Sequence, residues 1–172
     1  FPLPWLSTAP TGGASATESA DYHGPGRGVA NAILALLHAH RVTGDARFAD
    51  KAEALVRRVI HPDDDIASLH LLEVERRWSY TVCLPALGRY LWVHEARGTD
   101  ARWNYARACL LHYARWMAEH EYCYLDKPEV LEFPTETWAA QDIRKSEVFD
   151  LAAWHAPTAE ERARFLERAR FF

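Results

Sequence analysis

Cysteine is scarce in this chain, and neither a cysteine pair nor a histidine motif of a known metal site is present. Its three cysteines, Cys83, Cys109 and Cys123, are an odd number without a C-x-x-C pair. This argues against a disulfide framework and against zinc held by thiolates, and three free thiols favour a reducing, cytoplasmic compartment. H-E-x-x-H is missing, and the two histidines of the segment 38–40 would lie on different faces of a helix. We therefore expect no metal and no cofactor.

Long apolar runs and an excess of basic charge are also lacking. No stretch approaches the roughly 18 apolar residues of a membrane-spanning helix, so we expect no membrane partner. Lys and Arg total 20 against 24 Asp and Glu, a net charge of −4. We therefore expect no nucleic-acid partner. Apolar residues are 49% of the 172, with seven each of Trp, Tyr and Phe, which is enough to build a buried core.

The first 21 residues differ in composition from the rest. They are rich in Pro, Thr, Ser, Gly and Ala, which predicts an extended arm or linker over residues 1–21. The chain does not begin with Met, so we expect either a processed product or part of a longer protein. Residues 22–172 are predicted to form one α-hairpin repeat domain.

The predicted repeat unit is an apolar inner helix, a short turn and a charged outer helix. TGDARF at residues 43–48 and GTDARW at residues 98–103 place Asp45 and Asp100 at the same point of two copies, about 55 residues apart. Glycine suits a helix end and aspartate a helix start. This period excludes tetratricopeptide and ankyrin repeats, of about 34 and 33 residues. A third, degenerate copy begins with Thr158 and Glu161 at capping-box spacing. The expected hairpins cover residues 27–60, 79–121 and 137–172.

The sequence thus predicts an all-α fold of antiparallel αα-hairpins. Inner helices that are apolar on most of their circumference must be covered by other helices on most of it. Hairpins that lie side by side provide this cover. The inner helices then run parallel, and their N-terminal ends form one rim. Pro85 is expected to kink or shorten the second inner helix.

Aromatic and ionisable residues gather at the expected N-terminal end of every inner helix. We expect Trp78 and Trp138 to share one cleft there. The alternative interpretation makes Trp138 a core residue and Asp142 and Lys145 a solvated pair. The clusters are Tyr22, His23 and Arg27 for the first helix, Arg77, Trp78 and Tyr80 for the second, and Glu132, Glu136, Trp138, Asp142 and Lys145 for the third.

Such a rim suits a carbohydrate, and the repeat points to a family. Aromatic faces stack on the C–H faces of sugars, polar groups take the hydroxyls, and helix N-termini favour acidic groups such as uronates. The repeated turn resembles the hairpin repeat of the six-hairpin (α/α) toroid glycosidases and related polysaccharide lyases and epimerases, over residues 22–172. This resemblance implies a substrate funnel at the N-terminal ends of the inner helices. Because three hairpins are expected here against six in a full toroid, we expect half of a toroid in a longer chain, or an arc completed by another copy.

Two reaction types and one non-enzymatic role remain open for an oligosaccharide or polysaccharide partner. A glycoside hydrolase needs two carboxyls, for which Glu136 and Asp142 are the leading pair, with Glu132 and Glu75 in reserve. A lyase or epimerase would use His23 or Tyr80 as acid or base and arginine to neutralise a uronate. A non-catalytic helical-repeat scaffold that binds a protein or a glycan is the third possibility. The expected substrate-binding residues are Tyr22, His23, Arg27, Arg77, Trp78, Tyr80, Trp138 and Lys145.

Overall fold

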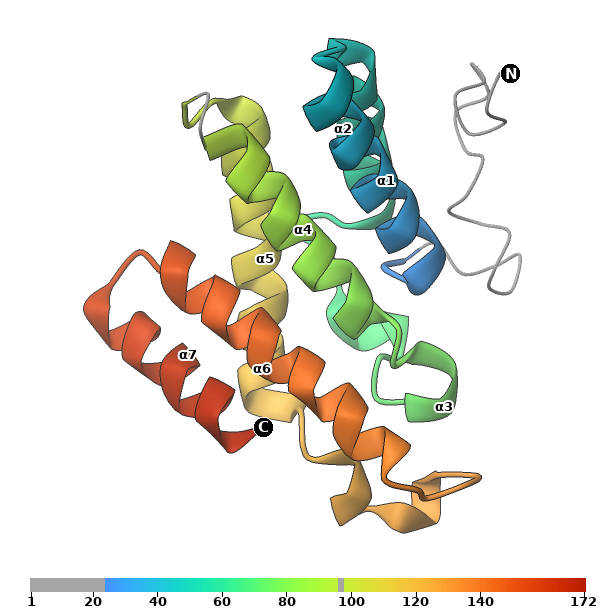
Figure 1. Cartoon of the computed structure of the whole chain (residues 1–172). Coiled ribbons are helices and arrows are strands. Elements are labelled where there is room, and N and C mark those ends of the chain that lie inside the picture. Colours follow the sequence, from blue (N-terminus) through green and yellow to red (C-terminus); the bar gives the residue numbers. More distant parts are fainter. Residues whose placement is uncertain (1–23, 96–97) are drawn as a thin grey trace.

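The computed structural model describes residues 24–95 and 98–172, and this part of the chain is helical without strands. The expected arm over residues 1–21, with Tyr22 and His23, lies outside the described residues. No helix in the described part is long and apolar enough to span a membrane. Six long helices dominate (Figure 1): α1 Arg27–Thr43, α2 Ala46–Val59, α4 Tyr80–Glu95, α5 Ala101–His120, α6 Thr137–His155 and α7 Ala159–Phe171. The shorter pieces are α3 Val74–Arg77 and 3-10 turns at Ile66–Leu69, Tyr124–Asp126 and Pro128–Val130.

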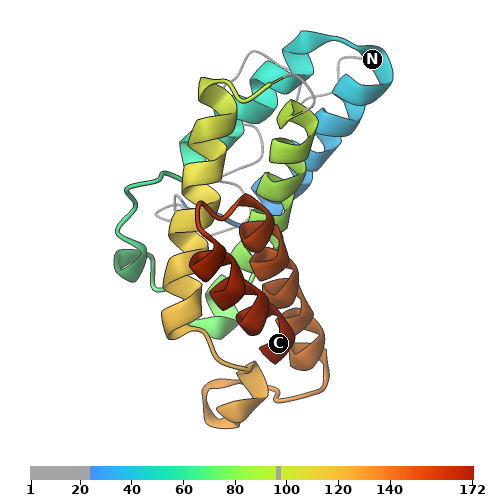
Figure 2. The ribbon, with the colours of Figure 1, turned by 90° about the vertical axis from the view of Figure 1, so that its left-hand side faces the viewer.

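These helices confirm the all-α prediction, and they fall into three pairs of consecutive helices. The hairpins are α1 with α2, α4 with α5, and α6 with α7, and the two helices of each pair are in contact. The inner helices α1, α4 and α6 form a row in which α4 packs against both others. Both ribbon views show these three helices running in the same direction, with their first residues at the same end (Figures 1 and 2). The predicted parallel arrangement of the inner helices is therefore confirmed.

The repeated sequence motif forms the turn inside each of the first two hairpins. Gly44 and Gly98 take φ values of 72° and 106°, a left-handed backbone in which a side chain would be strained. The Asp45 carboxylate then accepts a hydrogen bond from the Arg47 amide, and Asp100 does the same for the amides of Arg102 and Trp103. In the third hairpin the Thr158 hydroxyl caps α7 by accepting from the Glu161 amide at 3.2 Å. The caps were thus correctly identified from the sequence.

The middle helix α4 is buried on most of its circumference. Gly88 lets α4 approach α6 closely, because a Cβ atom at this position would lie 2.5 Å from Leu151 Cδ1. Pro85 lies inside the helix, yet α4 is continuous from Tyr80 to Glu95, so the expected shortening is not observed. The start is tight, with i→i+3 bonds from the Thr81 amide to Trp78 and from the Val82 amide to Ser79. Trp78 therefore stands directly at the start of α4, on the rim.

Candidate functional site

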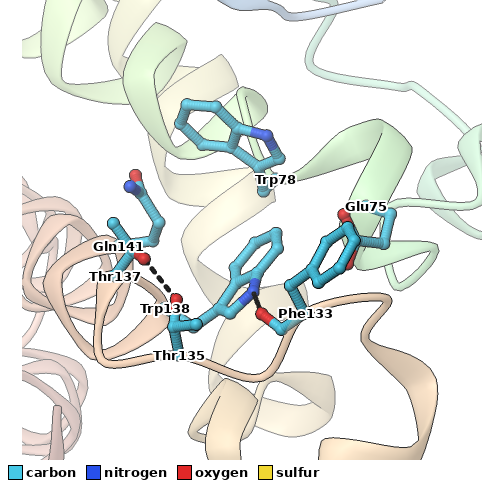
Figure 3. A pocket seen from close by; sticks show the side chains of 7 residues that line it. All are labelled: Glu75, Trp78, Phe133, Thr135, Thr137, Trp138 and Gln141. Atoms are coloured by element: carbon cyan, nitrogen blue, oxygen red, sulfur yellow. Dashed lines mark hydrogen bonds between the residues drawn. The ribbon is translucent and has the colours of Figure 1, made fainter.

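A pocket of about 290 Å³ opens at the end of the row where α4 and α6 begin. Trp78, which precedes α4, and Trp138, in the first turn of α6, both line it, which confirms that the two indoles share one cleft (Figure 3). α3 contributes a carboxylate, and the loop before α6 contributes an aromatic ring and a hydroxyl. The lining residues are Glu75, Trp78, Phe133, Thr135, Thr137, Trp138 and Gln141.

Trp138 is held in a fixed orientation by contacts at both of its ends. Its Nε1–H donates to the Phe133 carbonyl at 3.0 Å. Its ring meets the buried Tyr124 edge to face, with 5.6 Å between the centroids. Burial raises the pKa of Tyr124 far above its ordinary value, so this ring stays a neutral packing partner. The indole is thus positioned before any ligand arrives.

Trp78, just before α4, lies near one arginine from each of the other two inner helices. The guanidinium carbon of Arg27, the first residue of α1, lies 5.8 Å from the centroid of the Trp78 ring. The guanidinium carbon of Arg144 on α6 lies at the same distance. Cations near an indole face are attracted by its quadrupole. The two arginines place positive charge beside the aromatic pocket.

The remaining pocket residues supply hydrogen-bonding groups. Glu75 is exposed, and one of its carboxylate oxygens accepts from the Glu132 amide at 2.7 Å. The side-chain oxygen of Gln141 accepts from Arg144, and the hydroxyls of Thr135 and Thr137 are hydrogen-bonded to each other (Figure 3). A carboxylate, an amide and two hydroxyls therefore surround two indoles in one open pocket.

Asp142 and Lys145 lie on the same side of α6 as Trp138, but further along the helix and buried. Lys145 Nζ lies 2.9 Å from Asp142 Oδ1 and 2.7 Å from Glu121 Oε2, and it donates to the Tyr122 carbonyl at 2.5 Å. The Lys145 and Glu121 side chains are 0% exposed and that of Asp142 is 7% exposed. The interpretation as a solvated pair is therefore wrong. Asp142 does not line the pocket and is committed to an ion pair, which argues against its expected role as a catalytic carboxyl.

Other expected site residues also lie away from the pocket lining. Tyr80 is fully buried and its hydroxyl donates to Glu121, so it belongs to the buried network with Lys145. Arg77 is partly buried on α3 and does not line the pocket. Glu136 is exposed at the start of α6, between the lining residues Thr135 and Thr137. The sequence pattern did not distinguish the residues of the buried network from the residues that line the open pocket.

Several lining residues were not identified from the sequence. Gln141 follows Trp138 by three positions, so helical spacing alone could have placed it on the same face. Phe133, Thr135 and Thr137 belong to the loop and first turn that lead into α6, but nothing in their residue types marks them as lining. Among residues 24–95 and 98–172, no group of three or more His, Cys, Asp or Glu side chains is arranged to hold a metal ion.

No match to this chain was found among protein-family models, curated proteins or solved structures. The geometry of the pocket therefore carries the functional argument by itself.

Proposed function

We propose that the chain is a carbohydrate-active protein that binds a sugar in the rim pocket formed by Trp78, Trp138 and Glu75. The observation that carries this proposal is that two indoles line one open pocket together with a carboxylate, an amide and two hydroxyls. Indole faces can cover the C–H faces of a sugar ring, while the polar groups hydrogen-bond to its hydroxyls. The edge-to-face contact with Tyr124 and the bond to Phe133 keep Trp138 ready for this stacking.

The preferred reaction is glycoside hydrolysis, with Glu75 and Glu136 as the carboxyl pair. Hydrolysis needs one carboxylic acid to protonate the leaving oxygen and one carboxylate to assist the attack on the anomeric carbon. Glu75 lines the pocket from α3, and Glu136 stands between two lining threonines at the start of α6. The pair thus comes from two different elements, α3 and the start of α6, and it replaces the expected pair that included Asp142.

A lyase or epimerase acting on uronates is the second candidate. It is favoured by Arg27 and Arg144, whose guanidinium groups flank Trp78 and would pair with a sugar carboxylate. It is disfavoured by the burial of Tyr80, whose hydroxyl is committed to Glu121 and is not available as an acid or base. Hydrolysis therefore remains the preferred reaction.

We extend the proposal to the architecture, as an arc of an (α/α) toroid. On α6, Ile143 and Trp154 are 65% and 73% exposed. A further hairpin packed beside α6 would cover these side chains. Light scattering would measure whether the chain associates with itself. Substituting Ile143 and Trp154 with Ser should leave the fold intact.

The reaction is tested with a panel of neutral and acidic oligosaccharides. Released reducing ends report hydrolysis, and absorbance of an unsaturated product reports a lyase. We expect hydrolysis that Glu75→Gln abolishes, while Glu73→Gln, two residues away and outside the rim pocket, leaves it unchanged. Unsaturated products would favour the lyase, binding without turnover would favour the scaffold, and an absence of both binding and turnover would contradict the proposal.

A further inference from the structure

A second pocket, of about 380 Å³, shares no lining residue with the rim pocket. It is formed between the loop over residues 67–73 and the last turns of α5. Figure 2 shows the loop that precedes α3 standing beside α5. The residues that matter here are His70, Leu71, Leu72, Glu73, Trp116 and His120. None of them belongs to the proposed carbohydrate site.

The wall opposite α5 is anchored, so the pocket is preformed. The Tyr105 hydroxyl donates to the Ile60 carbonyl at 2.9 Å, and the Tyr113 hydroxyl donates to Asp64 Oδ2 at 2.7 Å. His112 Nε2 donates to the Asp64 carbonyl at 2.8 Å. Further along, Leu71 is 1% exposed and inserts into the core. The loop is thus held by hydrogen bonds before the stretch that faces the pocket and by the buried Leu71 within it.

The α5 side of the pocket is aromatic and offers a hydrogen-bond acceptor. The rings of Trp116 and His120 are stacked, with 4.9 Å between their centroids and 13° between their planes. His120 Nδ1 lies 2.8 Å from the Trp116 carbonyl oxygen. Because a carbonyl only accepts, Nδ1 must carry the hydrogen, and neutral His120 then has its lone pair on Nε2. The stack fixes the ring that holds this acceptor.

The charge of the pocket favours a cation over an anion. Glu73 is the one Asp, Glu, Lys or Arg among the lining residues. Its carboxylate lies 4.0 Å from the Arg76 guanidinium, and both side chains are at least half exposed, so this ion pair is weak. The Glu73 carboxylate accepts hydrogen bonds, as does His120 Nε2 when Nδ1 holds the ring hydrogen, and His70 adds a second imidazole to the lining. Leu72 and Trp116 supply an apolar surface beside them.

We infer that this second pocket binds a small organic cation with an aromatic body, of the arylalkylammonium class. The ammonium group donates to Glu73 and to His120 Nε2, and the ring packs against Leu72 and Trp116. Attraction between an ammonium group and the Trp116 indole adds to this. The volume is within the range of small-molecule sites.

Calorimetric titration with phenethylamine tests the inference on the whole chain. Phenethyl alcohol and 3-phenylpropanoate are the matched neutral and anionic probes. We expect phenethylamine to bind most tightly, and added salt to weaken its binding without affecting phenethyl alcohol. Glu73→Gln should weaken phenethylamine binding about fivefold. Glu75→Gln, two residues away on the rim-pocket side of α3, is the matched control and should leave it unchanged.

A second variant tests the hydrogen-bond acceptor of His120 separately from its stacking on Trp116. His120→Phe keeps an aromatic ring against Trp116 and removes Nε2, and it should weaken phenethylamine binding about three- to tenfold. Nuclear magnetic resonance of the Trp116 indole N–H should report the occupied pocket. The inference is overturned if 3-phenylpropanoate binds as tightly as phenethylamine, if Glu73→Gln and Glu75→Gln have equal effects, or if no Trp116 resonance shifts on binding. Failure here leaves the rim-pocket proposal intact, because the two pockets share no lining residue.

Discussion

Two neighbouring parts of one side of α6 use polar and aromatic residues in opposite ways. In the first turn and a half, Trp138 and Gln141 line an open pocket. Just beyond them, Asp142 and Lys145 are buried with Glu121. Charged side chains thus stabilise the fold here, while an indole is available to a ligand. Residue type alone therefore does not tell which part of a helix side binds and which part stabilises.

The largest expected effect is a loss of stability when the buried ion network of Lys145, Glu121 and Asp142 is broken. Lys145→Met removes the ammonium group that lies within 2.9 Å of both Glu121 and Asp142, leaving two buried carboxylates without their cation. We expect the free energy of unfolding to fall by about 3–5 kcal/mol. Chemical denaturation measures this loss. Adding Glu121→Gln and Asp142→Asn should restore part of it, and a loss below about 1 kcal/mol in the single variant would show that the network does not support the fold.

The contact between α4 and α6 should respond less strongly. Gly88→Ala places a Cβ atom 2.5 Å from Leu151 Cδ1, so the leucine or the helix axis must move. We expect a loss of about 1–3 kcal/mol in unfolding free energy. Denaturation of the variant measures it. Leu151→Ala in the same chain removes the clash, and if it does not improve the stability of Gly88→Ala, the close approach of α4 and α6 is not what requires glycine.

Substitutions of the two indoles that line the rim pocket should affect binding more than stability. Trp78→Ala and Trp138→Ala each remove one indole from the rim pocket. We expect an oligosaccharide that the chain binds to lose about tenfold or more in affinity with each variant, because aromatic stacking supplies much of the contact area. Calorimetric titration measures the affinity, with Trp154→Ala as the control for an exposed indole outside the pocket. Equal effects of all three variants would indicate nonspecific binding.

The smallest effect is a pH dependence at the other end of α6. Burial lowers the pKa of His155, whose ring packs edge to face against Trp103. The unfolded chain then binds a proton that the folded chain resists, so stability falls as pH drops through the unfolded value of about 6.5. His155→Phe should flatten part of this decline. Denaturation midpoints between about pH 5 and pH 8 measure it, and His38→Phe, at an exposed position of α1, serves as the control.

The hairpins were predictable because their signals are local. Asp45, Asp100 and Thr158 each bond to amides two or three residues away, so the capping motifs are legible in the sequence itself. The shared position of Trp78 and Trp138 also followed, because the direction of the inner helices fixes which ends meet.

The point along α6 at which pocket lining gives way to burial was not predictable. It depends on Glu121 at the end of α5, 24 positions before Lys145, and no periodic pattern within α6 reveals that partner. Spacing placed Trp138, Asp142 and Lys145 on one face, but the boundary between lining and burial runs between Gln141 and Asp142. Lysine is rarely fully buried, so the residue type of Lys145 indicated a solvent-exposed side chain.

The locally closed turns have a consequence for how the chain folds. Each reversal between α1 and α2, or between α4 and α5, needs only a glycine and an aspartate that are neighbours or nearly so in the sequence. Little loop-closure entropy is lost when such a turn forms, so a helical pair can nucleate before it meets the others. We therefore expect assembly by docking of preformed helical pairs, with the α4–α6 contact at Gly88 among the late steps.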